Sequence, residues 1–365
     1  MSELQIRPAQ LSDLDNLVNL EIASFQSDRM SARSLRRFIK SSQDELLVAV
    51  AGDELLGYLL LLYRKGTNLA RIYSLAVDAK ARGRGIAQQL LQQAELAARE
   101  QASAFIRLEV SVNNQPAIQL YKGMGFHTFG RIAEYYGDGS DAIRMERAIR
   151  RVAKPVPATG YYEQTTPFSC GPASLLMAMN RLASPREMTR SEELAIWREA
   201  TTIYMTSGHG GCSPVGIALA AKRRGFSPTL YLSTEATPFI DSVRDLDKKS
   251  VIEQVHQDYL AELNSLGAEI HYQTIDSAEL VKHLKEGAVA IALISTWRLN
   301  RNKAPHWVLL SGADDRFIYL CDPDMDHDDW HTELDYIDVP VALDEFQQMS
   351  RYGRERLSAT ILITL

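Results

Sequence analysis

The sequence predicts two domains, an α/β domain followed by an α+β domain. The chain has 365 residues, which exceeds the size at which a single hydrophobic core stops growing. Pro155 and Pro157 restrict the backbone and remove two hydrogen-bond donors, which is typical of a short stiff linker. Strand and helix patterns alternate before these prolines, whereas a helix precedes the strands after them. We therefore expect domains over 1–152 and 161–365, joined by a linker over 153–160.

The first domain begins with a short strand and two helices. A strand is predicted over 5–8, and apolar residues at helical spacing predict a helix over 11–25 with Ser12 as its cap. The second early helix falls within 25–40. Apolar runs then predict strands over 46–50, 55–63, 72–77 and 105–112. Two further helices are predicted over 85–101 and 116–124. A final hairpin completes the order, with strands over 133–136 and 143–145.

The second domain is less regular. Composition predicts a helix that begins at Cys170 or Gly171 and runs past Met179. Ser213 and Pro214 open another helix, because serine caps a helix and proline fits its first turn. Buried strands are predicted later in the chain, over 289–295, 307–311 and 318–322. This order favours an α+β fold.

Charge is distributed unevenly between the two halves. Residues 1–154 carry 21 of the 40 Lys and Arg but 17 of the 46 Asp and Glu, so the remainder is acidic. This distribution fits an anionic cofactor in the first half and a basic ligand in the second. Neither half has the long basic run of a nucleic-acid binder, so we expect no nucleic-acid partner.

Composition also indicates a cellular compartment. Hydrophobic residues make up 45% of the chain and charged residues 24%, the usual mix for a globular protein. The N-terminus lacks the pattern of a signal peptide, and the longest apolar runs are strand-sized, so we expect no membrane partner. Three cysteines are too few and too irregular for a disulfide framework. We expect a cytoplasmic protein; the sequence does not specify its oligomeric state.

A glycine-containing basic turn lies between a predicted strand and a long helix. The segment 75–87 reads LAVDAKARGRGIA, and such a turn directs several unpaired N–H groups at one point, where the helix dipole reinforces them. Gly83 and Gly85 allow the backbone to approach a phosphate, and Arg82 and Arg84 add positive charge. The segment therefore predicts an anion site.

These residues resemble the GNAT acetyltransferase family, whose pyrophosphate loop has the pattern Q/R-x-x-G-x-G/A. Here the pattern is Arg82-x-x-Gly85-x-Ala87, and a second match, LEVSVNNQPAIQLYKGMGF over 108–126, is similar to the late segment of the family. The resemblance covers nearly all of 4–149 and is nearest to the ribosomal-protein alanine acetyltransferases. It implies a mixed central sheet, acetyl-CoA as cosubstrate and a primary amine of a peptide or protein N-terminus as acceptor.

The same resemblance implies roles for individual residues. Glu109 would be the general base that takes a proton from the amine through water, and Tyr121 the general acid for the departing thiolate. Asn114 would hold the pantetheine arm. The alternatives are a solvent-exposed strand carboxylate at Glu109, a packing role for Tyr121 and a small-molecule amine as acceptor. The residues expected to contact acetyl-CoA are Leu75, Ala76, Val77, Arg82, Gly83, Arg84, Gly85, Ile86, Ala87, Asn114 and Tyr121.

A cysteine opens a helix in the second domain. The segment 164–175 reads QTTPFSCGPASL, and a thiol at a helix N-terminus is favoured as the reactive thiolate. Gln164 can supply an oxyanion donor beside the N–H of Cys170. His306 follows at a spacing found in papain-like enzymes, and Asp322 precedes a proline.

This arrangement is similar to the C39 family of papain-like cysteine peptidases. The resemblance implies Cys170 as nucleophile, His306 as its base and Asp322 as the group that orients the imidazole. The same triad carries out hydrolysis or amide transfer, and the domain could instead be a non-catalytic module that recognises a peptide. His209 and Cys212 form a rival pair.

The acidic segment that runs from Asp322 to Glu333 is similar in spacing to a calcium loop. Its acidic residues fit the ligand spacing, but His327 stands where such a loop needs glycine, so we expect no metal. The sequence thus predicts an acetyltransferase fused to a cysteine hydrolase domain, and the fusion itself suggests that both act on one peptide.

Overall fold

A computed structural model of the chain describes residues 3–25, 28–150, 160–183, 186–202, 210–301, 304–328 and 330–365. The chain divides into two units, Met1–Val152 and Ala153–Leu365. Except for Gly160, the predicted linker over 153–160 lies outside the described residues. No helix in the described parts of the chain is long and apolar enough to cross a membrane.

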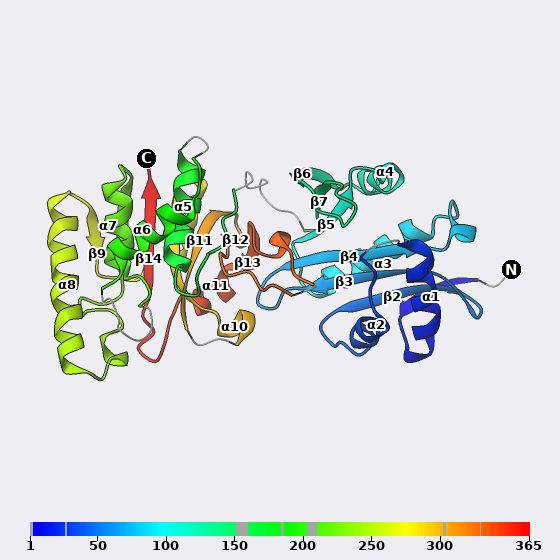
Figure 1. Cartoon of the computed structure of the whole chain (residues 1–365), viewed down its shortest axis with the longest axis horizontal. Helices are drawn as coiled ribbons and strands as arrows, with labels where there is room; N and C mark the ends of the chain where they lie inside the picture. The colour runs from blue at the N-terminus through cyan, green and yellow to red at the C-terminus, as the bar shows by residue number, and fades with distance from the viewer. Residues whose placement is uncertain are drawn as a thin grey trace. The chain divides into compact units, whose positions relative to one another are not determined.

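A seven-stranded mixed sheet organises the first unit (Figure 1). Its strands pair antiparallel except for β4 and β5, which are parallel, so the predicted mixed sheet is confirmed. In spatial order the strands are β1 (Leu4–Pro8), β2 (Glu45–Ala51), β3 (Glu54–Tyr63), β4 (Leu69–Val77), β5 (Phe105–Ser111), β7 (Ala142–Ala148) and β6 (His127–Ile132).

Helices cover both faces of this sheet. The helices are α1 (Leu14–Ser24), α2 (Ala32–Ile39), α3 (Ile86–Glu100) and α4 (Gln115–Gly123). Helix α3 packs against β2, β3 and β4, and its Leu90 shares a core cluster with Leu59 and Leu61 of β3. Tyr58 points to the opposite face because side chains alternate along a strand, and α1 and α2 pack there.

One predicted strand of the first unit is wrong. The final hairpin was expected over 133–136 and 143–145, but its first strand is β6, which ends at Ile132. Glu134 has a φ of 51°, which extended backbone does not allow. The N–H of Gly139 donates to the carbonyl of Tyr136 at 2.8 Å, so residues 133–140 form the turn.

A second seven-stranded sheet organises Ala153–Leu365. All of its strand pairs are antiparallel except β8 and β9. In spatial order the strands are β13 (Val339–Ala342), β12 (Phe317–Cys321), β11 (Pro305–Ala313), β10 (Val289–Ser295), β14 (Ala359–Thr364), β8 (Ser227–Leu232) and β9 (Glu269–His271). The three predicted strands are present, and the last ends at Cys321, one residue earlier than expected.

Two helical layers enclose this second sheet. On one face lie α5 (Cys170–Leu182), α6 (Arg190–Ala200), α7 (Pro214–Arg223) and α8 (Leu246–Ser265), drawn green to yellow in Figure 1. Ile291, Leu293 and Leu309 share the core cluster of this layer. The other helices are α9 (Ser277–Lys285), α10 (Trp297–Asn300) and α11 (Leu343–Met349). Helix α5 is buried along most of its length and packs on β10 and β11.

Candidate functional sites

A glycine turn leads from β4 into α3. Gly83 and Gly85 have φ angles of 77° and 75°, in the left-handed region that other residues rarely adopt. A Cβ at either position would meet no atom of the described residues within 4 Å, so backbone conformation rather than crowding favours glycine there. Gly85 is the N-cap of α3 and supplies no side-chain cap. The first N–H groups of α3 therefore have no intrahelical acceptor and point out of the positive end of the helix, where they could bind an anion.

The other residues of the predicted cofactor loop differ in exposure, and therefore in which groups a cofactor could contact. Arg82 and Arg84 are exposed, and Nε of Arg82 donates to the carbonyl of Val77 at 3.4 Å. Ile86 is 2% exposed because its side chain packs in the core. Its contact with a cofactor would come from its backbone N–H. Ala87 is partly exposed in the first turn of α3.

Strands β4 and β5 separate at the end of the sheet that carries this turn. They pair from Leu69 with Phe105 to Ile72 with Leu108, yet both strands continue beyond that point. The register between β3 and β4 shifts beside Tyr73, which indicates a β-bulge that bends β4. As a result Leu75, Ala76 and Val77 pair with β3 while their other edge is turned toward the gap between β4 and β5.

Glu109 lies in β5 immediately after the last pair with β4. Its side chain is 5% exposed, and its Oε2 lies 3.4 Å from Nη1 of Arg71, whose side chain is 3% exposed. The alternative of a solvent-exposed carboxylate is therefore wrong. The ion pair places a carboxylate at the edge of the gap between β4 and β5.

Tyr121 is buried in α4, and burial raises the pKa of its phenol to about 12. A second tyrosine, Tyr136, lies near both the predicted acid and the predicted base. Burial raises the pKa of Tyr136 above its usual range, and the charges of Glu109 and Tyr121 add to the effect. Tyr135 is 36% exposed, yet the pKa of its phenol is also raised, by partial burial first and by the charge of Glu109 second. Sequence analysis missed this pair, although two adjacent tyrosines before a glycine turn are a visible signal.

Asn114 has a local structural task. It is the N-cap of α4, and its Oδ1 accepts from the N–H of Ala117 at 3.3 Å. The cap leaves the Asn114 amide nitrogen as its donor toward a ligand. The predicted contact with pantetheine would therefore have to use that nitrogen.

The second candidate site joins Cys170, His306 and Asp322. Cys170 is the first residue of α5, His306 lies at the start of β11, and Asp322 follows β12. Nε2 of His306 lies 2.7 Å from Oδ1 of Asp322, and the side chain of Cys170 is near enough to the ring to contribute to its raised pKa. Because Asp322 engages Nε2, Nδ1 is the ring atom left for the thiol.

Electrostatics of this triad favour a charged imidazole. Burial opposes the charge on His306, but the charge and hydrogen bond of Asp322 and the contact with Cys170 outweigh it, so the pKa of His306 is raised well above 6.5. All three side chains are buried, and only their edges are open to solvent. A charged imidazole beside a thiol stabilises the thiolate, which is the nucleophilic form.

Gln164 lies against the acidic segment that follows Asp322. Its N–H donates to the carbonyl of Pro323 at 2.9 Å, and its Nε2 donates to Oδ1 of Asp324 at 2.7 Å. Its Oε1 is buried without a partner among the described residues. The predicted oxyanion donor is therefore engaged with a carboxylate, and its remaining amide hydrogen would have to serve that role.

The other two cysteines, Cys212 and Cys321, are also buried. Burial raises the pKa of the Cys212 and Cys321 thiols well above the usual range. His209, the proposed partner of Cys212, lies outside the described residues. Within the described ranges, no group of three or more His, Cys, Asp or Glu side chains is arranged to hold a metal ion.

Glu193 is a buried residue that sequence analysis missed. It lies in α6 with a relative exposure of 0%, yet it carries a carboxylate. Hydrogen bonds from the segment before Cys170 converge on it, from Tyr162, Thr165 and Ser169. Nothing in the local sequence around Glu193 distinguishes it from the partly exposed glutamates Glu192 and Glu199 of the same helix.

Comparisons with known proteins identify both units. Residues 159–364 match the Peptidase_C39 like family, and residues 13–149 match the Acetyltransferase (GNAT) domain. The predicted family resemblances are confirmed by these matches.

Similar proteins come from distant organisms. N-alpha-acetyltransferase 30 of Xenopus laevis is 29% identical over 144 residues, which is 39% of this chain and 51% of that protein. The match thus spans about half the length of that relative. A putative [ribosomal protein bS18]-alanine N-acetyltransferase of Bacillus subtilis is 28% identical over 141 residues, 38% of this chain and 92% of that protein.

The solved structures that are similar to part of this chain include Ard1 from Thermoplasma volcanium. It is 25% identical, covers 40% of this chain and 99% of its own, and has a TM-score of 0.38. The family-model match extends over more than half of the chain, from residue 159 to residue 364. The chain therefore belongs to the Peptidase_C39 like family, and it carries a GNAT acetyltransferase domain ahead of that family's domain.

Proposed function

We propose that the first domain is an N-acetyltransferase that moves an acetyl group from acetyl-CoA to a primary amine. The observation that carries this proposal is the uncapped helix start at Gly85, beside the gap between β4 and β5. Diphosphate oxygens fit the N–H groups of such a turn, and an extended pantetheine arm fits the open edge of Leu75–Val77. The match to the GNAT domain supports the same assignment.

Acid–base chemistry in the gap would use Glu109 and Tyr121. An amine is mostly protonated at neutral pH and must lose a proton before it attacks the thioester. The Glu109 carboxylate, paired with Arg71, would accept that proton through water. Tyr121, whose pKa of about 12 keeps it protonated, would donate a proton as the thiolate of CoA departs.

The acceptor is most consistent with the N-terminus of a peptide or protein. Relatives that share about two fifths of this chain bear the names of N-alpha-acetyltransferases. Tyr135 and Tyr136 present two phenols beside Glu109, and phenols can hydrogen-bond a peptide backbone that enters the gap. A small-molecule amine is the alternative acceptor.

One experiment separates these acceptors. Acetyl-CoA consumption by the full chain is measured with a panel of peptides that differ in their first residues and with a panel of small amines, and products are identified by mass spectrometry. Acetylation of peptide α-amino groups is expected. Turnover of small amines with no peptide turnover would overturn the peptide assignment but leave the acetyltransferase assignment in place.

We infer that the second domain carries out acyl chemistry on an amide through Cys170. The supporting observation is the contact between His306 and Asp322, with Cys170 near enough to the imidazole to help raise its pKa. The thiolate would attack the carbonyl carbon and form a thioester as the amine leaves with a proton from His306, and water would then hydrolyse the thioester. The alternative is a module that binds peptides for the acetyltransferase without turnover.

Two variants separate these readings of the second domain. If the domain only delivers substrate, Cys170→Ala leaves acetylation of a peptide unchanged, while deletion of residues 160–365 raises its KM. If the domain is a hydrolase, mass spectrometry of the same peptide shows a cleaved or deamidated product that Cys170→Ala abolishes. A peptide that is both trimmed and acetylated would support a shared substrate.

A further inference from the structure

The segment before Cys170 is organised around one buried carboxylate. Glu193 Oε1 accepts from the N–H of Thr165 at 2.8 Å and from the hydroxyl of Ser169 at 2.5 Å. Its Oε2 accepts from the hydroxyls of Thr165 at 2.6 Å and Tyr162 at 2.9 Å. Four donors from eight consecutive residues thus satisfy both oxygens, which is the condition under which a buried carboxylate is tolerated.

Ser169 occupies a special place among these donors. It is the N-cap of α5, a position where a serine oxygen ordinarily accepts a hydrogen bond from the first turn. Here it makes no such bond. Its hydroxyl instead donates to Glu193 and accepts from the hydroxyl of Thr166 at 2.7 Å. The Ser169 hydroxyl therefore contacts Glu193 of α6 and does not cap α5.

The position of the Ser169 hydroxyl affects the surroundings of the nucleophile, Cys170. The first turn of α5 contains Cys170, Gly171 and Pro172, and proline has no N–H to donate. The N–H groups of Cys170 and Gly171 have no acceptor within the helix. A serine cap accepts from the second or third helical residue, so here its oxygen would face the N–H of Gly171, at the helix start where a negative charge on a substrate oxygen or on the thiolate would otherwise be stabilised.

We propose that Glu193 is a positioning residue for the cysteine site: it holds the hydroxyl of Ser169 away from the start of α5 and fixes the segment that presents Cys170. The proposal rests on the cysteine chemistry inferred above.

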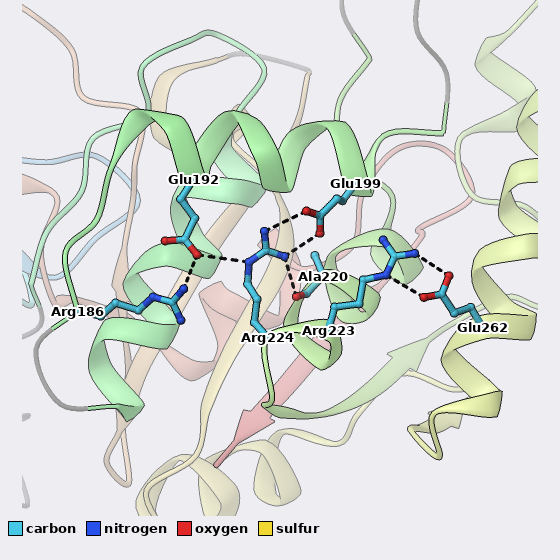
Figure 2. A network of polar contacts seen from close by, with 7 residues as sticks. All are labelled: Arg186, Glu192, Glu199, Ala220, Arg223, Arg224 and Glu262. Atoms are coloured by element: carbon cyan, nitrogen blue, oxygen red, sulfur yellow. Dashed lines mark hydrogen bonds and ion pairs between the residues drawn. The ribbon is translucent and has the colours of Figure 1, made fainter.

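Helix α6 is braced so that it can hold this segment in place. Glu192 lies 3.4 Å from Nε of Arg224 at the end of α7, and Glu199 lies 2.8 Å from Nη1 of the same arginine (Figure 2). Arg186 also contacts Glu192, at 2.6 Å. Two adjacent residues of α6 therefore contact different parts of the domain. Glu192 binds Arg224, whereas Glu193 accepts hydrogen bonds from the segment before Cys170.

A second contact from α6 supports the same segment. The rings of Phe168 and Trp197 lie 5.0 Å apart between centroids. Trp197 is one helical turn after Glu193, so both side chains reach the segment from one side of α6. Nε1 of Trp197 donates to the carbonyl of Gly210 at 2.9 Å, which fixes the orientation of the indole.

The test measures alkylation of Cys170 in the full chain with iodoacetamide, which is neutral, and with iodoacetate, which is an anion. Peptide mapping gives the rate at each cysteine. For Glu193→Ala we expect the rate at Cys170 to fall about tenfold, because the thiolate loses the N–H groups that stabilise it. The ratio of the iodoacetate rate to the iodoacetamide rate is also expected to fall, because the released Ser169 oxygen then faces the anionic reagent.

Ser169→Ala in the Glu193→Ala background supplies the decisive comparison. It removes the oxygen that would cap α5, so the iodoacetate-to-iodoacetamide ratio is expected to return toward that of the unchanged protein. A loss of packing alone would not be reversed by a second truncation. Glu193→Gln is the conservative variant if Glu193→Ala does not fold, since its amide opposes one of the four donors but keeps the side-chain volume. Glu192→Gln is the matched control: its amide oxygen can still accept from Arg224, so α6 stays braced and a much smaller change in the rate at Cys170 is expected than in the Glu193 variants.

The outcomes are distinguishable. If Cys170 in the unchanged protein reacts no faster than Cys212 or Cys321, the cysteine chemistry itself is overturned. If Cys170 reacts fast and a folded Glu193 variant retains both the rate and the ratio, the role of Glu193 alone is overturned. Equal losses of the alkylation rate at Cys170 in the Glu192 and Glu193 variants would also contradict the role of Glu193.

Discussion

Nε2 of His306 and Oδ1 of Asp322 lie 2.7 Å apart at the ends of two neighbouring antiparallel strands. His306 is near the start of β11, and Asp322 is the residue after β12, so strand pairing brings them together. The carboxylate is itself anchored, because its Oδ1 accepts from the N–H of Asp324 at 3.1 Å. The pair therefore presents an imidazole of fixed orientation to Cys170.

Asp322→Asn is expected to slow alkylation of Cys170 by roughly 10²-fold, the scale of a lost acid–base partner. The asparagine keeps the volume of the side chain but removes the charge that raises the pKa of His306. The measurement is the iodoacetamide rate against pH. In the unchanged protein the charged imidazole persists well above pH 6.5, whereas in the variant the imidazole loses its proton at a lower pH.

The free energy of unfolding should depend on pH through the ionisation of His306. Because the pKa of His306 is raised in the folded state, its contribution to the free energy of unfolding is full below about pH 6.5 and is lost as pH rises through the raised pKa. The difference in Tm between the unchanged protein and Asp322→Asn is therefore expected to shrink as the pH rises. A difference that grows with pH would contradict the assigned ionisation.

The sequence could predict the parts of each site that carry a local signature. The left-handed glycines at 83 and 85 and the cysteine at the start of α5 are visible in short segments, because turns and helix starts are encoded locally. The Arg71–Glu109 ion pair could not be predicted, because it depends on how far β4 and β5 stay paired before they separate. Glu193 was missed for a similar reason: only the packing of α6 shows that it is buried while Glu192 is not.

Tyr121→Phe is expected to reduce acetyl transfer by roughly 10²-fold while acetyl-CoA affinity stays nearly unchanged. The substitution removes a hydroxyl from a buried side chain and leaves the ring, which packs against Phe126 with centroids 5.7 Å apart. Single-turnover acetylation gives the rate, and calorimetry gives the affinity. Unchanged turnover would remove Tyr121 from the mechanism and favour a packing role.

Gly85→Ala tests the anion site at α3. The residue has a φ of 75°, so an alanine costs about 1 kcal/mol of folding free energy through backbone strain. It should also turn the first N–H groups of α3 away from their common focus and weaken acetyl-CoA binding by about tenfold, or ~1.4 kcal/mol.

Gly225→Ala is the control for that strain, since Gly225 has a φ of 87° and a Cβ there meets no described atom within 4 Å. It lies after α7 in the second unit. Comparable destabilisation is expected from both variants, with acetyl-CoA affinity lost in Gly85→Ala alone. Equal affinity in the two variants would argue against diphosphate binding at this turn.

Two adjacent arginines offer a matched test of how α6 is held. Arg224 is partly buried, with 14% of its side chain exposed, and it bonds Glu192, Glu199 and the carbonyl of Ala220. Arg223 bonds only Glu262 in the network of Figure 2, and its side chain is 35% exposed. Exposed ion pairs contribute about 0–1 kcal/mol, whereas a partly buried charge that loses several partners costs more.

Arg224→Ala is therefore expected to lower the Tm of the second domain by about 5 °C, and Arg223→Ala by about 1 °C. Because α6 also carries Glu193, Arg224→Ala should slow alkylation of Cys170 several-fold, although Arg224 lies outside the cysteine site. Scanning calorimetry and the iodoacetamide rate measure the two effects on the same samples. A large loss of Tm with an unchanged rate at Cys170 would mean that the network stabilises the helices without any coupling to the nucleophile.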